Sequence, residues 1–171
     1  AVRLRLWNDP YSETGVSYGA GGNDLVTTIA LAKRAKKAQM DILLDFQYSD
    51  FWADPGKQTI PKAWRGFLDE ELENAVFSFT RDTLHTLKRE GAFPDMVQVG
   101  NELTNGLLWP NGKKPNYDNL ARFVNAGIRG VRAVSKDTPI MLHLDNGGNL
   151  AMYQDWFDHY MQRREGLDFE V

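Results

Sequence analysis

A unit made of a strand, a long loop and a helix occurs four times along the 171-residue chain, at intervals of about 40–50 residues. The apolar runs that predict its strands are Val2–Trp7, Asp41–Phe46, Met96–Val99 and Pro139–Leu144. Strands that alternate with helices form a parallel sheet, and their crossovers are right-handed in nearly all known cases. The repeat therefore predicts an α/β fold.

Helix caps and apolar residues at helical spacing predict the helices of these units. They extend from Asp24 to about Gln39, from about Asp69 to Glu90, from Asn116 through Val131, and over Tyr153–Tyr160. Gly91 is the expected stop of the second helix, since glycine commonly follows a helix end. Leu167–Val171 is predicted to begin a fifth strand.

Two architectures fit this order of elements. A five-stranded doubly wound sheet is complete at this length, whereas a (β/α)8 TIM barrel needs about 250 residues. We favour the barrel, because every strand precedes a long loop rich in polar and aromatic residues, as on a barrel's catalytic face. The chain starts and stops on strand-like sequence. We therefore expect residues 1–171 to form a partial catalytic barrel domain, truncated at both ends.

Composition narrows the possible partners. The net charge is −3 and the basic residues are scattered, so nucleic acid is not an expected partner. No apolar run approaches the roughly 18–20 residues of a membrane span. The absence of cysteine excludes disulfides and thiolate zinc sites but does not fix the compartment.

Polar side chains gather where the predicted strands end. They are Arg5, Asp45, Gln47, Asn101, Glu102, His143 and Asp145, and the aromatic residues around them are Trp7, Tyr48, Trp52, Trp64 and Trp109. Trp52, Trp64 and Trp109 lie in polar loops and are the better candidates for ligand contacts. Such a set suits a carbohydrate, whose rings offer apolar faces to aromatics and hydroxyls to polar groups.

Other chemistries find less support in the sequence. The glycines at 19, 21 and 22 follow the first strand too distantly for a dinucleotide loop, and no Walker phosphate loop or GxSxG elbow is present. His85 and His159 fall on predicted helices. His143 and Asp145 share a face at a strand end, where ligand hydrogen bonding is favoured over a fragment of a metal site. We expect no metal and no cofactor.

Glu102 is the candidate for the chemistry itself. Cleavage of a glycosidic bond needs an acid that protonates the departing oxygen and a second carboxylate opposite it. A partly apolar pocket raises a carboxyl pKa and so keeps the acid protonated. Asn101 is placed to bind a sugar 2-hydroxyl. The alternative is that Asn101 and Glu102 only cap or solvate a turn.

Four segments together resemble glycoside hydrolase family 53, the arabinogalactan endo-β-1,4-galactanases. They are DFQYSDFWADPGKQ, PKAW, VQVGNELTNGLLWP and IMLHLDNG, in the family's order and spacing over essentially the whole chain. The resemblance implies a (β/α)8 barrel, of which this chain covers about strands 2 to 6, and hydrolysis of β-1,4-galactan with retention. It makes Glu102 the general acid/base and places the nucleophile Glu beyond Val171.

The same resemblance implies the substrate contacts. Arg5, Asn101, the Asp54–Lys57 segment, Asp145 and Asn146 match family positions, and we add Trp52 and His143 as substrate-binding candidates. Gln47 departs from the family, which has His there, so the pH profile or a subsite affinity is expected to differ. We expect a monomeric, extracellular or surface-bound enzyme that binds galactan. The alternative is a non-catalytic carbohydrate-binding protein on a decayed barrel.

Overall fold

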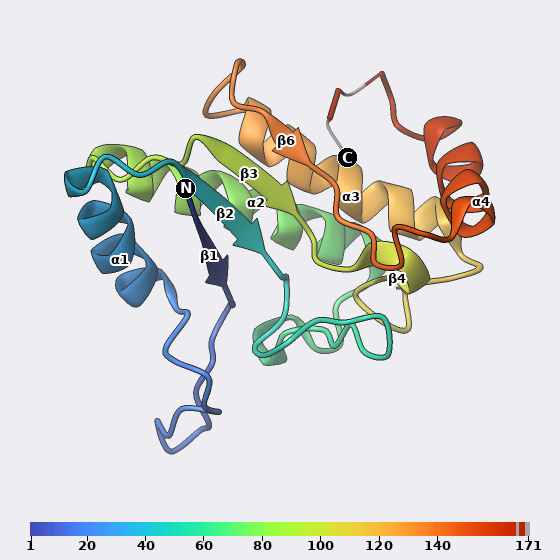
Figure 1. Ribbon diagram of the computed structural model, residues 1–171. Helices are drawn as coiled ribbons and strands as arrows, with labels where there is room; N and C mark the ends of the chain where they lie inside the picture. The colour runs from blue at the N-terminus through green and yellow to red at the C-terminus, as the bar shows by residue number, and fades with distance from the viewer. Residues whose placement is uncertain (167, 170–171) are drawn as a thin grey trace.

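A parallel sheet of four strands organises the computed structural model, which describes residues 1–166, 168 and 169. The strands are β1 (Val2–Leu6), β2 (Ile42–Phe46), β3 (Met96–Val99) and β6 (Ile140–Met141), and they lie side by side in that order (Figure 1). Each strand pairs in parallel with the next. The order never reverses, as it would at the switch point of a doubly wound sheet, so it fits the barrel.

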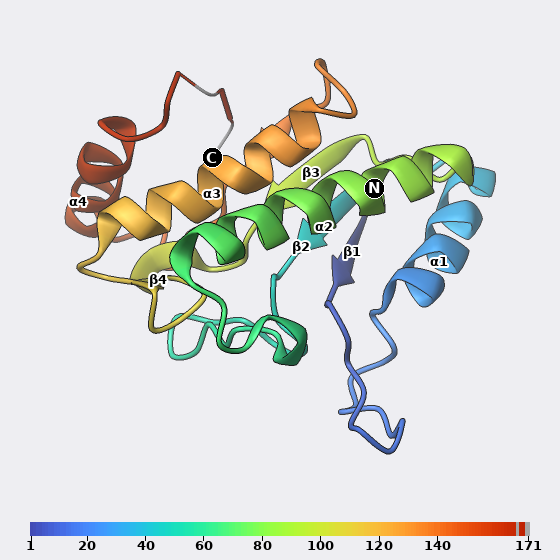
Figure 2. The same ribbon diagram turned by 180° about the vertical axis from the view of Figure 1, so that it is seen from behind.

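The helices lie to one side of this sheet. They are α1 (Leu25–Lys37), α2 (Asp69–Arg89), α3 (Tyr117–Arg132) and α4 (Leu150–Met161). Helices α2 and α3 cover one face (Figure 2), and the opposite face carries no helix among the described residues (Figure 1). A barrel has this arrangement, with helices outside and strand side chains inside. No helix of the described residues is long and apolar enough to cross a membrane.

The predicted ends of α1, α2 and α3 are confirmed to within two residues, as expected for boundaries, whereas α4 begins three residues before the predicted Tyr153. The Asp24 carboxylate accepts a hydrogen bond from the Thr27 backbone N–H at 2.7 Å, and the Asn116 side chain caps α3 in the same way. Gly91, just after α2, has a φ of 67°. Local capping chemistry therefore sets these ends.

The predicted strands near the C-terminus need correction. Strand β6 is only Ile140–Met141, where Pro139–Leu144 was expected. The His143 carbonyl accepts from the Leu103 backbone N–H at 2.9 Å, so the chain here bonds to the turn after β3 rather than extending the ladder. The fifth strand was predicted over Leu167–Val171. Residues 167, 170 and 171 lie outside the described residues, and residues 168 and 169 are not in a strand.

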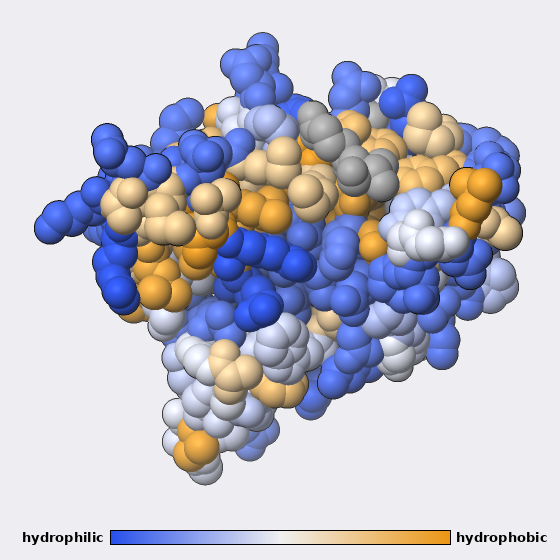
Figure 3. Space-filling view, viewed as in Figure 1, coloured by the Kyte–Doolittle hydropathy of each residue, from blue (hydrophilic) through white to orange (hydrophobic). Residues whose placement is uncertain are grey.

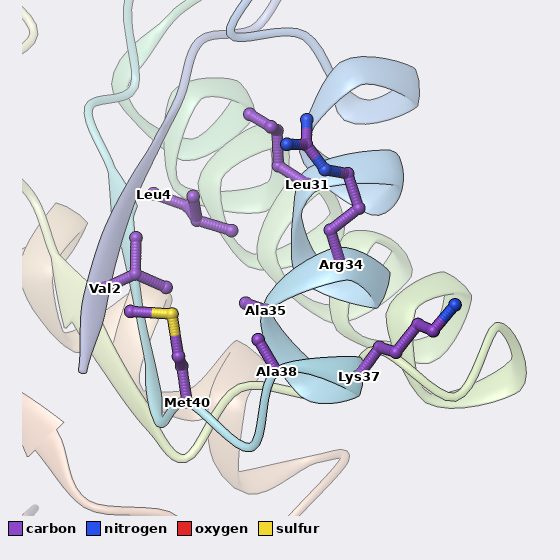
Figure 4. A pocket seen from close by; sticks show the side chains of 8 residues that line it. All are labelled: Val2, Leu4, Leu31, Arg34, Ala35, Lys37, Ala38 and Met40. Carbon is purple, nitrogen blue, oxygen red and sulfur yellow. The ribbon is translucent and has the colours of Figure 1, made fainter.

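Figure 3 shows apolar surface around β1 and α1, beside strongly hydrophilic atoms near the strand ends. Part of the apolar surface lines a cavity of about 590 Å³ between the start of β1 and α1 (Figure 4). Val2, Leu4, Leu31 and Ala35 contribute apolar side chains to it. The cavity lies at the opposite end of the sheet from the long loops, so it is a poor candidate for polar chemistry.

Two glycines let α3 pack closely. A Cβ on Gly127 would lie 2.6 Å from Val99 Cγ1, and one on Gly130 would lie 2.8 Å from Thr80 Cβ and 2.9 Å from the Phe77 carbonyl oxygen of α2. Cβ atoms in proteins essentially never approach other heavy atoms this closely. The spacing between α2 and α3 therefore requires glycine at 130.

We predict that Gly130→Ala destabilises the protein by about 2 kcal/mol. The new Cβ would meet the Phe77 backbone, so the overpacking cost lies at the upper end of about 1–3 kcal/mol, and better helix propensity returns about 1 kcal/mol. Urea unfolding measures the change. Gly148→Ala is the control, because a Cβ there meets nothing within 4 Å. A Gly130→Ala protein as stable as the wild type would contradict the packing argument.

Candidate active site

A polar cavity of about 280 Å³ opens where β1, β2 and β3 end. Its lining residues are Arg3, Arg5, Gln47, Trp52, Ala53, Asp54, Lys57, Asn101 and Glu102. Six of the predicted site residues are thus brought together, from the ends of β1 and β3 and from the loop after β2. His143, Asp145 and Asn146 do not line this cavity and lie beside it, after β6.

Glu102 reaches the cavity through an unusual backbone turn. Gly100 has a φ of 79°, and Glu102 has a left-handed conformation, with φ 50° and ψ 55°. A Cβ on Gly100 would lie 2.6 Å from Leu103 Cδ2, so this position requires glycine for both conformation and space. Glu102 then precedes a short 3₁₀ turn, η2 (Leu103–Asn105). The turn ends the strand abruptly and presents Glu102 at its end.

The surroundings of Glu102 favour its protonated form. Burial raises the pKa of its carboxyl, and the nearby negative charges of Asp145 and Asp54 raise it further, while Arg3 opposes them. Among the described residues, the carboxyl has no hydrogen-bond or ion-pair partner. It is therefore available to a bound molecule, with the electrostatics that a general acid needs.

A buried network holds the strand ends together beneath Glu102. The Asp45 carboxylate, from β2, accepts from Arg3 Nη2 of β1 at 2.9 Å and from Gln98 Nε2 of β3 at 2.9 Å. Burial raises the pKa of Asp45 to about 6, and the positive charge of Arg3 limits the rise. Arg3 also donates to Asn101 Oδ1 at 2.6 Å. Asn101 is thereby tied to all three strands.

Hydrogen bonds fix the orientation of the Asn101 amide. Its Nδ2 donates to the Ala53 carbonyl at 2.8 Å, so Oδ1 faces Arg3 and, at 2.9 Å, His143 Nδ1. Burial and the charge of Arg3 lower the pKa of His143, which favours the neutral ring. Because Oδ1 can only accept, Nδ1 carries the proton, and the 3.4 Å approach of the Glu102 N–H to the same nitrogen is not a hydrogen bond. His143 thus contacts Asn101 directly.

Arg5 and Trp52 form one wall of the cavity. The Arg5 guanidinium lies 4.5 Å from the centre of the Trp52 ring, which is a cation–π distance. On another side, Lys57 Nζ lies 3.5 Å from an Asp54 carboxylate oxygen. The cavity therefore combines an aromatic surface with paired charges. This combination suits a hydroxyl-rich ligand.

The residues after β6 support the turn that carries Glu102. Asp145 hydrogen-bonds the Thr104 hydroxyl, and Asn146 Nδ2 donates to Asp145 at 2.6 Å. Asp145 also acts on the Glu102 carboxyl through its charge. No group of acidic or histidine side chains among the described residues has the arrangement of a metal site.

Several aromatic predictions are wrong. Trp64 is buried and packs edge-on against Phe79, and Tyr48 is buried with its hydroxyl 2.8 Å from Thr80 Oγ1. Trp7 is also fully buried. Trp109 lines a separate cavity beside Phe67 and Pro110. The polar loop sequence around Trp64 did not reveal that its ring packs inward, and of the three better candidates only Trp52 lines the site.

Other site residues were missed as candidates. Arg3 shares a strand face with Arg5, so the alternation of β1 contained the signal for its role. Gln58, Gln98 and Thr104 are buried polar residues that bond to the strand ends. No pattern in the sequence distinguishes them from ordinary loop and strand residues.

A family model described as glycosyl hydrolase family 53 matches residues 1–171. The chain belongs to glycosyl hydrolase family 53. Its curated relatives include an endo-beta-1,4-galactanase of Bacillus subtilis, 38% identical over 89% of this chain and 34% of the relative. An arabinogalactan endo-beta-1,4-galactanase of Thermothelomyces thermophilus is 37% identical over 99% of this chain and 50% of the relative.

Solved structures of the family agree with the fold. A catalytic domain of family 53 from Ignisphaera aggregans superposes with a TM-score of 0.92, at 40% identity, over 97% of this chain and 46% of that one. A fungal beta-1,4-galactanase superposes with a TM-score of 0.85, at 34% identity, over 97% of this chain and 48% of that one. The fold is therefore part of the TIM barrel of this family. The chain spans half or less of the length of these relatives.

We predict that Asp145→Asn lowers the pKa of Glu102, because the substitution removes one of the two negative charges that raise it. The carboxyl ¹³C shift of Glu102, followed against pH by NMR, measures this directly. Asp158→Asn makes the same substitution on the exposed side of α4, and the pKa of Glu102 should not change. An unchanged pKa in Asp145→Asn would refute the electrostatic account.

Proposed function

We propose that the whole protein is a retaining endo-β-1,4-galactanase in which Glu102 is the general acid/base. The observation that carries this proposal is the unpaired, half-buried Glu102 carboxyl in the polar cavity, with its pKa raised by burial and by Asp145 and Asp54. Membership of family 53 and the names of the relatives support the reaction and the substrate. The substrate is β-1,4-galactan, such as the side chains of pectic arabinogalactan.

The reaction proceeds in two steps. Protonated Glu102 gives its proton to the glycosidic oxygen while a carboxylate on the opposite side of the sugar attacks the anomeric carbon, so that the bond to the departing chain breaks. The Glu102 carboxylate then takes a proton from water, whose oxygen replaces the attacking carboxylate. The family resemblance puts the attacking group in a Glu that follows Val171, so no residue of this chain is assigned that role.

The cavity residues bind the galactan. Asn101 Oδ1 is occupied by Arg3 and His143, and one Nδ2 hydrogen by Ala53, which leaves the second Nδ2 hydrogen for a sugar 2-hydroxyl. Trp52 offers its ring to a sugar face. Arg5, Asp54, Lys57, His143, Asp145 and Asn146 complete the substrate-binding set that we propose.

The second candidate is a non-catalytic carbohydrate-binding protein, for which Gln47 in place of the family His is the motivating observation. Gln47 bonds to Trp7 Nε1 at 2.9 Å, to the Ala53 N–H at 3.1 Å and to Asp45 at 3.2 Å. It therefore maintains the wall of the cavity, and its presence does not require loss of catalysis.

For the galactanase, we also propose a monomeric state and an extracellular location.

We predict that Glu102→Gln in the full-length protein lowers galactan turnover about 10²–10⁴-fold, the usual contribution of a general acid or base. Binding of galactan, measured by calorimetry, should persist because the cavity keeps its shape. Glu90→Gln makes the same substitution at the C-terminal end of α2, away from the cavity, and should keep full activity. Undiminished turnover by Glu102→Gln would exclude Glu102 as the acid/base, and binding without turnover by the wild type would favour the second candidate.

A further inference from the structure

The backbone that carries Glu102 leaves the sheet, and within the described part of the chain no strand pairs with its carbonyl groups. Gly100 and Glu102 both have left-handed conformations, and the chain then enters the 3₁₀ turn η2. Left-handed conformations are unfavourable for residues other than glycine, so a left-handed Glu must be held by its surroundings. The direction of the Glu102 side chain depends on that backbone conformation.

Gln58, in the loop after β2, holds this backbone through its side-chain amide. Its Nε2 donates to the Asn101 carbonyl at 2.8 Å and lies 3.3 Å from the carbonyl oxygens of Glu102 and Asp54. One side-chain amide therefore joins the two peptide carbonyls at Glu102 to the loop that carries Asp54. In addition, the Gln58 backbone carbonyl accepts from the Trp109 N–H at 2.7 Å. Gln58 thus connects its own loop, after β2, to the loop after β3.

The orientation of the Gln58 amide is unambiguous. Three carbonyl oxygens face one end of it, so a reversed amide would place Oε1 against them. Gln58 is 2% exposed, and in the observed orientation its Oε1 is buried without a hydrogen-bond partner among the described residues. A buried unpaired oxygen is unfavourable. The amide at this position is therefore favoured by the contacts of Nε2 with the turn and not by Oε1.

We propose that Gln58 is a positioning residue for the acid/base, which acts on the substrate only through the backbone of Glu102. The inference rests on the proposed function. Gln58 lines no part of the cavity, whereas Glu102 and Asp54 do. Removing its amide frees the Asn101 and Glu102 carbonyls, so the left-handed turn relaxes and the carboxyl moves away from the glycosidic oxygen. A displacement of about 1 Å at a reacting group lowers the rate about 100-fold.

The test compares two substrates in the full-length Gln58→Met protein, in which an unbranched apolar side chain replaces the amide. On galactan, whose leaving group needs a proton, we expect kcat to fall about 100-fold with little change in KM. On a dinitrophenyl β-galactobioside, whose leaving group departs without a proton, kcat/KM should fall much less. A merely structural role lowers both activities equally, and equal losses or no loss on galactan would overturn the inference.

The control is Asn125→Leu, which also replaces a buried hydrogen-bonded amide by an apolar side chain, between α3 and Arg163. It should lose stability but keep the wild-type ratio of the two activities. If Gln58→Met does not fold, Gln58→Glu replaces it, because a protonated Glu still donates to Asn101. Its galactan activity relative to the wild type should then rise toward acid pH, and a constant ratio would refute the inference.

A wild type inactive on both substrates would defeat the proposed function and the catalytic part of this inference. The structural part, that Gln58 holds the left-handed turn of Glu102, is tested separately. A crystal structure of Gln58→Met then decides, since φ of Glu102 should leave its left-handed value of 50°. An unchanged turn in that structure would overturn the role of Gln58 whatever the substrate.

Discussion

The buried Asp45 carboxylate is the contact on which the rest of the site depends. It accepts from Arg3 of β1 and from Gln98 of β3, so it joins three neighbouring strands at their C-terminal ends. Asp45 is buried but the Arg3 side chain is 38% exposed, and this ion pair adds little net stability, because desolvation of the carboxylate offsets the attraction between the charges. Its effect is geometric, since Arg3 and Gln98 also reach Asn101 Oδ1 and set where that amide lies. Asn101, the residue beside Glu102, is thereby fixed to the sheet as well as to the loop after β2.

The turn after β3 depends on this anchoring. Gly100 permits one left-handed step, and the Gln98 side chain donates to the Gly100 carbonyl at 2.7 Å. Gln58 then donates to the next two carbonyls, so three successive peptide groups that leave the sheet are satisfied by side-chain amides. Backbone groups at a buried strand end must find such partners. The packing of Gln98 and Gln58 against this turn thus fixes the backbone of Glu102 and also contributes to the burial that raises its pKa.

Much of the fold and the position of Glu102 after a strand followed from local sequence rules, whereas the contacts that support the site did not. The repeated units, the caps at Asp24 and Asn116, and the placement of Glu102 at a strand end all depend on residues near in sequence. The hairpin of β4 (Gly106–Leu107) and β5 (Gly112–Lys113) pairs residues that are close in sequence and was not predicted. The short β6 and the burial of Trp64 depend on distant contacts. Gln58 and Arg3 were missed for the same reason, because their partners lie more than forty residues away in the sequence.

Gln47 shows how one departure from the family is accommodated. Its amide accepts from two donors, Trp7 Nε1 and the Ala53 N–H, and donates to Asp45. A neutral imidazole has one donor and one acceptor nitrogen, so it cannot make the same three contacts by the same geometry. Gln does not titrate, so it adds no second charge change beside Asp45, whose pKa is raised to about 6 by burial. Gln47 therefore removes one pH-dependent group from the wall of the cavity, and the raised pKa of Glu102 does not depend on it.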